Sequence, residues 1–167
     1  MDLPEHWGTT PDERARRTPA DDLVAAPSAR WTRGATSTAD PATLWRWLGQ
    51  LTVAPYSYDL VDNLGRRSPR TLTPGADDLQ VGQRLLMIFV IDSFVAGEHL
   101  TIRRRSTRGP VGEFAVTYAV HPDPAGSRLT ATVVLDRTGA VVGKALAWGD
   151  LVMMRRQLTL LCALAAG

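Results

Sequence analysis

The feature that most constrains the fold is a long amphipathic segment near the C-terminal end of the chain. From about Val142 to Ala165 the apolar residues recur at the spacing of an α-helix. They form one broad stripe: Ala147, Trp148, Leu151, Met154, Leu158, Cys162 and Ala165. A helix with such a stripe must bury it against another layer of the domain, so the rest of the chain has to supply a matching apolar surface.

The segments that precede this helix predict that surface as an antiparallel sheet. Strand character is found at 29–38, 84–94, 99–105, 112–120 and 128–136. Residues 112–120 alternate between apolar and small or polar side chains, which places Phe114, Val116, Tyr118 and Val120 on one face. Turn residues at 96–98 and 121–127 connect these segments as consecutive hairpins. Residues 84–94 are apolar on both faces, which favours a strand that is covered on both sides.

Two short helices are expected after the first strand. Asp40 caps the first, Pro41 takes its first position, and apolar residues at helical spacing carry it to Leu51. In the stretch PYSYDLVDNLG, Ser57 is a cap and Gly65 a helix end for a second helix.

Asp59 and Asp62 lie in that second helix, three residues apart. They could form an acid/base pair or a metal site. We favour a structural role, because no histidine or further carboxylate stands at ligand spacing.

Composition and charge limit the function classes. The chain has 167 residues, 44% of them hydrophobic, which suits one globular domain with a real core. Its net charge is only +2, so we expect no nucleic-acid partner and no insertion into a membrane. One cysteine and three dispersed histidines predict no disulfide, no metal site and no cofactor. The first residues lack the apolar core of a signal peptide or membrane anchor, which predicts a cytoplasmic protein.

Residues 1–27 differ in composition from the rest of the chain. They are rich in Pro, Asp, Arg and Ala and contain few large apolar residues, Trp7 being the obvious exception. We therefore expect 1–27 to be a flexible or loosely docked extension, and 28–167 to be the folded domain.

Four stretches carry a resemblance to a known group of proteins. WRWLGQL, YSYDLVDNLGR, LQVGQRLLM and ALAWGDLVMMRRQL look like bacterial polyketide cyclase/dehydrase-like proteins of the START-like superfamily (SRPBCC), over about residues 28–165. The resemblance implies an α+β helix-grip fold, in which a curved antiparallel sheet wraps around the C-terminal helix and two short helices follow the first strand. It also implies that 28–167 is a ligand-binding domain with an apolar cavity.

The faces of these elements define a candidate cavity. The expected lining residues are Trp31, Tyr56, Tyr58, Phe114, Val116, Tyr118, Trp148, Leu151, Met154 and Arg155. Tyr118 and Arg155 are the candidate catalytic residues, because each would place a polar group among apolar ones. The alternatives are that Tyr118 only packs, and that the Arg155 guanidinium reaches solvent or a carboxylate such as Asp59 or Asp92.

Three functions remain open. The first, which we favour, is a carrier or sensor of an apolar small molecule such as a lipid, polyketide or terpenoid. The second is a cofactor-independent cyclase or dehydratase that positions a polyketide-like substrate and moves a proton. The third is a protein-interaction domain with no cavity. The volume between sheet and helix separates the third from the other two.

A partner of the same sequence is a further expectation. Met153, Leu160 and Leu164 fall on the outer side of the projected last helix, and residues 84–94 are apolar on both faces. Either a homodimer contact or the docked extension would cover them.

Overall fold

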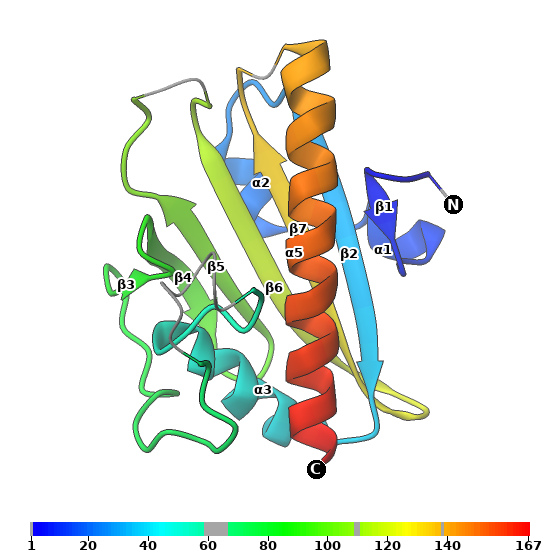
Figure 1. Ribbon diagram of the computed structural model, residues 1–167, viewed down its shortest axis with the longest axis vertical. Coiled ribbons are helices and arrows are strands. Elements are labelled where there is room, and N and C mark those ends of the chain that lie inside the picture. The colour runs from blue at the N-terminus through cyan, green and yellow to red at the C-terminus, as the bar shows by residue number, and fades with distance from the viewer. Residues whose placement is uncertain (1, 59–66, 109–110, 138) are drawn as a thin grey trace.

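A computed structural model describes residues 2–58, 67–108, 111–137 and 139–167, and Figure 1 shows the arrangement. A single sheet forms one layer and a long helix lies against its inner face. In chain order the elements are β1 (His6–Trp7), α1 (Pro11–Ala15), α2 (Pro19–Leu23), β2 (Ala29–Ser37), α3 (Pro41–Gly49), the 3-10 helix η1 (Gln50–Thr52), β3 (Arg84–Leu85), β4 (Phe89–Val95), β5 (His99–Arg104), β6 (Phe114–Asp123), β7 (Gly126–Leu135) and α5 (Ala140–Ala166). The expected α+β helix-grip architecture is confirmed, and α3 with η1 covers the first of the two short helices expected after the first long strand.

The sheet has seven strands in the order β1-β2-β7-β6-β5-β4-β3. Neighbours pair antiparallel from β2 to β3, and the short β1 adds a parallel pairing with β2 that the sequence pattern did not predict. The β6–β7 hairpin turns at Pro124 and Ala125, later than expected, because the alternation of β6 continues to Asp123. The sheet is therefore mixed, with a single parallel contact at the β2 edge.

Helix α5 crosses the sheet on the β2 side. It packs against β2, α3 and β7, whereas β4 and β5 lie toward the other edge of the sheet (Figure 1). The buried face of α5 includes Ala147, Met154, Leu158 and Cys162, as the helical stripe predicts. Helix α3 fills one end of the space under α5 with Leu44, Trp45, Trp47 and Leu48, all buried in the main core.

The segment 84–94 is a hairpin and not the continuous strand expected from its apolar run. Leu86 and Met87 both adopt positive φ angles, of 50° and 64°, between β3 and β4. Ile88 then donates its backbone N–H to the Leu86 carbonyl at 2.7 Å. Residues 84–89 of this run border a hollow under α5, and Ile91 farther along β4 is buried in the core. The helix expected to end at Gly65 falls in 59–66, outside the described residues.

The N-terminal segment packs along the outer face of the sheet. Ala20 and Val24, from α2 and the residue after it, are buried against Ala115 and Val134. Ala20 also donates its backbone N–H to the Thr117 hydroxyl at 3.0 Å. The outward side of β6 is thus covered by α2, and its inward side faces α5. This differs from the expectation of a flexible or loosely docked extension.

Residues 1–27 pack on the domain although they contain few large apolar side chains, and polar contacts explain why. Arg30 on β2 pairs with Asp21 at 2.7 Å, and Arg128 on β7 pairs with Glu13 at 2.8 Å, both with side chains largely withdrawn from water. Thr10 and Glu13 form a capping box at the start of α1. Partly buried charge pairs and caps replace the large apolar side chains by which docking is usually recognised.

We predict that Ala20→Glu releases the N-terminal segment, because Ala20 is fully buried and a carboxylate there has no cationic partner. The free energy of unfolding should fall by about 1–3 kcal/mol. Trypsin should cleave after Arg14, Arg16 and Arg17 faster than in the wild type, as measured by mass spectrometry of the fragments. Ala26→Glu, at an exposed position of the same segment, is the matched control. Equal cleavage rates in the two variants would contradict this packing.

Candidate functional site

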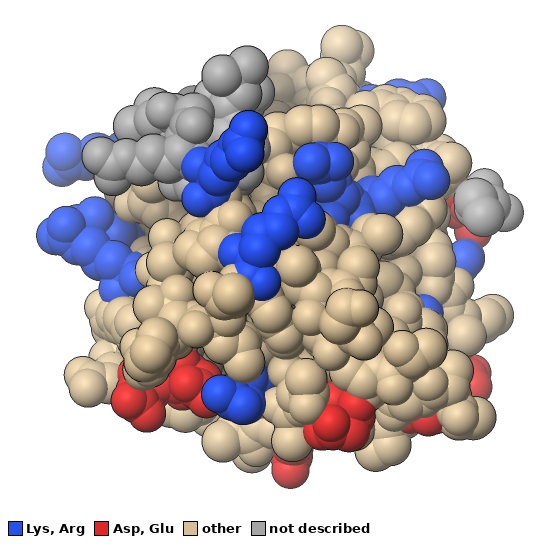
Figure 2. Space-filling view, turned by 60° about the horizontal axis from the view of Figure 1, so that its bottom comes forward, with Lys and Arg blue, Asp and Glu red and all other residues tan. Residues whose placement is uncertain are grey.

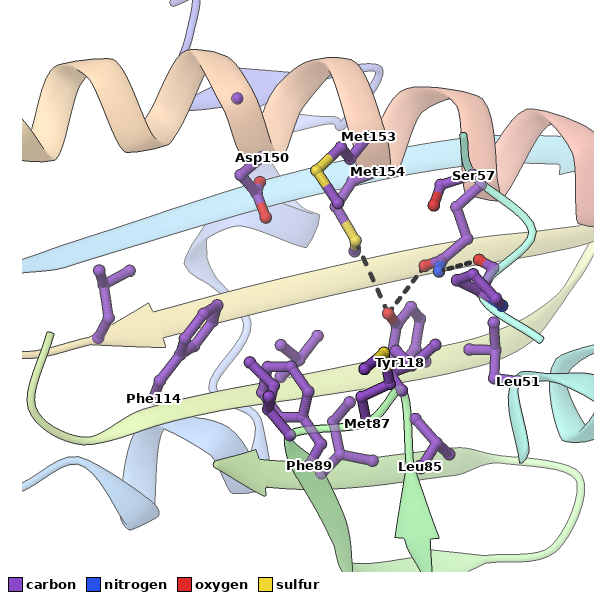
Figure 3. Close-up of a pocket in the computed structure, with 18 of the residues that line it drawn as sticks. Leu51, Ser57, Leu85, Met87, Phe89, Phe114, Tyr118, Asp150, Met153 and Met154 are labelled. Carbon is purple, nitrogen blue, oxygen red and sulfur yellow. Dashed lines mark hydrogen bonds between the residues drawn. The ribbon is translucent and has the colours of Figure 1, made fainter. Parts of the chain in front are cut away.

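A cavity of about 960 Å³ lies between α5 and the inner face of the sheet (Figure 3). Its floor is the sheet, where Trp31, Ile102, Phe114, Val116 and Tyr118 point inward. The hollow exists because α5 packs on the β2 side while α3 supports only one end of the helix. The side chains that could fill the remaining space do not reach across it, and most of the lining is apolar.

The cavity reaches the surface through an apolar rim. Met87 and Ile88, in the β3–β4 turn, face Leu146 and Met153 of α5 across the lining, and each of these four residues is substantially exposed. Met87 is 69% exposed and also carries one of the positive φ angles. The unbranched side chain of Met87 can change its conformation easily, which would suit the entrance of a cavity.

Tyr118 carries a polar group into the middle of the cavity. Its hydroxyl donates to Oε1 of Gln157 at 2.8 Å and lies 3.7 Å from the Met154 sulfur (Figure 3). Gln157 in turn donates from Nε2 to the Pro55 carbonyl at 2.6 Å. Burial, with a smaller effect of the Asp150 charge, raises the pKa of Tyr118 above its usual range, so the hydroxyl keeps its proton.

A second polar group is the ion pair between Arg33 of β2 and Asp150 of α5. Arg33 Nη2 lies 2.9 Å from Asp150 Oδ2, and the Arg33 side chain is 0% exposed. Arg33 also donates to the carbonyls of Glu5, Thr32 and Ala147. Asp150 is 15% exposed and lines the cavity, whereas Arg33 lies behind it.

The environment of Asp150 changes its acidity. Burial raises the pKa of its carboxyl from 3.8 to about 6, and the Arg33 charge opposes this shift without cancelling it. Burial also lowers the pKa of the Arg33 guanidinium. The carboxyl of Asp150 therefore titrates close to neutral pH, inside an apolar cavity.

Half of the residues expected from the sequence line this cavity: Trp31, Phe114, Val116, Tyr118 and Met154. Three others lie nearby without lining it. Leu151 is buried, and Tyr56 is buried against the Trp47 ring with centroids 6.2 Å apart. Tyr58 is 41% exposed and its ring lies under the Arg156 guanidinium.

Trp148 and Arg155 lie away from the cavity, contrary to the expectation. Trp148 is 47% exposed. Arg155 is exposed and its guanidinium carbon stands 5.4 Å from the centre of the Trp7 ring, in the N-terminal segment. Arg155 is therefore not placed to act on a molecule in this cavity. The cause is the rotation of α5, which presents residues 146, 149, 150, 153 and 157 to the cavity.

Arg33, Asp150 and Gln157 were not predicted as site residues. A signal for Arg33 was present, since it lies two residues after Trp31 on a strand and must share the inward face. Asp150 falls on the side of the projected helix opposite Trp148, and that side turned out to face the cavity. Gln157 gave no signal, because a single amide on a helix is ordinary.

Some of the features that suggested a second copy of the chain are covered within one chain, but Met153 stays 39% exposed, and a homodimer contact stays a prediction. Leu160 and Leu164 are partly buried against the main core, and Met153 lines the cavity. Both strands of the 84–94 hairpin, with the turn between them, border the cavity as well.

Other regions of the described chain offer weaker sites. A polar hollow of about 160 Å³ lies between the N-terminal segment and the outer face of the sheet, near His99 and His121. Within residues 2–58, 67–108, 111–137 and 139–167, no cluster of three or more His, Cys, Asp or Glu side chains suits a metal ion, and no helix has the length and apolarity needed to span a membrane. On the face shown in Figure 2 most basic side chains lie in the upper half and most acidic ones lie lower, where a basic side chain adjoins them.

The titration of Asp150 predicts a specific pH dependence. Because its pKa is raised on folding, the folded chain holds a proton that the unfolded chain has released, and stability falls as the pH rises from about 4 to about 6. The slope is at most about 1.4 kcal/mol per pH unit. Asp150→Asn should abolish this component of the profile in urea denaturation at pH 4, 5, 6 and 7. Asp92→Asn, which removes a partly exposed carboxylate paired with Arg103, should keep it. A wild-type profile parallel to that of Asp150→Asn would rule out the raised pKa.

Comparisons with known proteins identify the fold and no closer relative. No model of a known protein family matches the sequence, and no curated protein matches it. Solved structures do match. A protein from Nitrosospira multiformis has a TM-score of 0.56 at 11% identity, covering 80% of this chain and 94% of its own. One from Chromobacterium violaceum has a TM-score of 0.54 at 13% identity, covering 83% and 97%. The di-domain ARO/CYC StfQ of the steffimycin biosynthetic pathway has a TM-score of 0.54 at 14% identity, covering 87% of this chain and 52% of its own. These structures show that the chain has a helix-grip fold, the architecture that its sequence motifs predict.

Proposed function

We propose that this protein binds an apolar small molecule in the cavity between the sheet and α5, as a carrier or a sensor. The observation that supports the proposal is the cavity itself, with a volume of about 960 Å³ and a largely apolar lining. Pockets of this size and character bury most of the surface of a small ligand. A domain that served only protein contacts would be expected to fill this space with its own side chains.

The distribution of polar groups favours binding over chemistry. The described lining residues include no Ser–His or Cys–His pair, and the polar groups of Tyr118 and Gln157 are engaged with each other. Helix-grip folds support several functions, so the fold alone does not choose among them. The apolar wall and the open rim are what an uptake function requires.

A substitution at Gly149 tests this proposal. Gly149 lines the cavity, and a Cβ atom added there meets no other atom within 4 Å. Gly149→Trp should fill part of the hollow and weaken the binding of pyrene, a neutral apolar fluorophore, by about tenfold or more. Pyrene binding is measured from the ratio of its emission bands.

Gly149→Ala is the matched control at the same position. It should keep pyrene affinity within about twofold and raise the free energy of unfolding by up to about 1 kcal/mol, because alanine is the better helix former. If the wild type binds no pyrene, or if Gly149→Trp binds it unchanged, this cavity is not the binding site.

A cyclase or dehydratase activity is the second candidate, and one observation favours it. Asp150 has a pKa of about 6 and lines the same apolar cavity as the protonated Tyr118 hydroxyl. A carboxylate of that basicity can accept a proton from an acidic carbon near neutral pH. The Tyr118 hydroxyl would stabilise the enolate that forms only by turning its proton away from Gln157. The similar fold of StfQ, described as an aromatase/cyclase, is in keeping with this candidate.

Turnover separates the two candidates. If the chain is a cyclase, it should accelerate the ring closure of a linear poly-β-ketone, and Asp150→Asn should lower that rate by about 100-fold or more. Pyrene binding should stay within about threefold, since pyrene has no polar group to meet Asp150. Product formation followed by liquid chromatography measures the rate. If the rate of ring closure is the same with and without the protein, the cyclase proposal is overturned and the carrier or sensor proposal is retained.

A further inference from the structure

The polar groups of the cavity are arranged along one side. Asp150 and Gln157 are seven residues apart on α5, two helical turns, so both project from the same face of the helix. Tyr118 approaches Gln157 from the sheet below (Figure 3). The opposite wall is formed by apolar side chains of β3–β6, among them Phe89, Ile102 and Phe114. A bound ligand would therefore contact apolar side chains of the sheet on one side and the polar groups of α5 on the other.

Asp150 has an oxygen atom on this side of the cavity that is available to accept a hydrogen bond. Its Oδ2 atom accepts from Arg33, and within the described part of the chain no hydrogen bond reaches its other oxygen, Oδ1. Figure 3 shows the carboxylate directed from α5 toward the hollow. Because Asp150 lines the cavity and Arg33 does not, a guest meets the carboxylate before the guanidinium.

The neighbouring donor is already engaged. The single hydroxyl proton of Tyr118 goes to Gln157, and the Gln157 amide donates to the Pro55 carbonyl. What Asp150 and Tyr118 still offer to a guest are acceptor lone pairs and, from Asp150, negative charge. The cation in the lining, Arg84, is exposed at the rim, where water screens it.

We propose that the ligand is a neutral, largely apolar molecule with a hydroxyl or phenol group that donates a hydrogen bond to Asp150 Oδ1, and that the site discriminates against carboxylate ligands of the same shape. The inference rests on the proposed binding function and specifies its ligand class. A donor from the ligand forms a charge-assisted hydrogen bond in a water-poor cavity. A ligand carboxylate at that position has no proton to give and faces a like charge.

Three rigid probes of one shape test the inference: pyrene, 1-hydroxypyrene and 1-pyrenecarboxylate. At pH 7.5 the wild type should bind 1-hydroxypyrene about tenfold more tightly than 1-pyrenecarboxylate, and more tightly than pyrene once the greater hydrophobicity of pyrene is corrected for by its partition coefficient. Dissociation constants come from fluorescence titration. Pyrene reports on the cavity alone, so a failure of pyrene binding overturns the proposed function and this inference with it. Pyrene binding without the expected order of the other two probes overturns this inference alone.

Asp150→Asn supplies the decisive comparison. It removes the negative charge and leaves the charge of Arg33 unopposed behind the cavity wall. The order should reverse: 1-hydroxypyrene loses about tenfold in affinity and 1-pyrenecarboxylate gains about tenfold, while pyrene changes less than about threefold. Asp92→Asn, which removes a carboxylate outside the cavity, should leave the wild-type order intact.

A double variant guards against a folding defect in Asp150→Asn. Arg33→Met with Asp150→Leu removes both charges together, a change that buried ion pairs often tolerate. Its circular dichroism should match that of the wild type, and its corrected preference for 1-hydroxypyrene over pyrene should disappear. The inference is overturned if a folded variant without Asp150 binds pyrene and still shows the wild-type order of the three probes.

Discussion

The buried guanidinium of Arg33 is the interaction on which the rest of the arrangement depends. It connects three segments that are distant in sequence: the Glu5 carbonyl of the N-terminal segment, its own strand β2, and the Ala147 carbonyl and Asp150 carboxylate of α5. A fully buried cation without partners would destabilise the fold severely, so these groups must all be in place together. The position of α5 over β2 and the attachment of the N-terminal segment are therefore coupled at one side chain.

The cavity depends on that position. With α5 packed mainly on β2 and α3 filling one end, Gly149 and Met153 of α5 line the cavity together with Phe89 of β4 and Ile102 of β5. The bulky side chains of α3, including Trp45 and Trp47, build a solid core at that end. The two halves of α5 thus have different roles. The C-terminal half packs in the core, and the N-terminal half covers the cavity. The N-terminal segment adds to this by covering the outer face of the sheet, where Ala20 meets Ala115.

The polar groups of the cavity differ in what they leave available to a ligand. Its walls are apolar, Tyr118 and Gln157 satisfy each other, and the carboxylate of Asp150 stands out because its cationic partner is behind it. Such a site can orient a guest by one hydrogen bond while most of the binding free energy comes from apolar burial. The same carboxylate is the base in the proposed cyclase reaction. The two proposed functions therefore differ in whether Asp150 only accepts a hydrogen bond or also accepts a proton.

Periodicity and capping residues determined much of this protein: the inward face of β6, most of the stripe of α5 that packs, and the Asp40 and Pro41 helix start. The helix-grip class of the fold was implied by the resemblance of four sequence stretches to known proteins. Other features were decided only in the tertiary structure. Those are the splitting of residues 84–94 into a hairpin, the docking of the N-terminal segment through charge pairs, and the replacement of Arg155 by Asp150 at the cavity. The physical reason is that a sequence pattern states which side chains share a face of an element. How far a helix is rotated about its axis, and how far it stands off the sheet, depend on partners distant in sequence, here above all on Arg33.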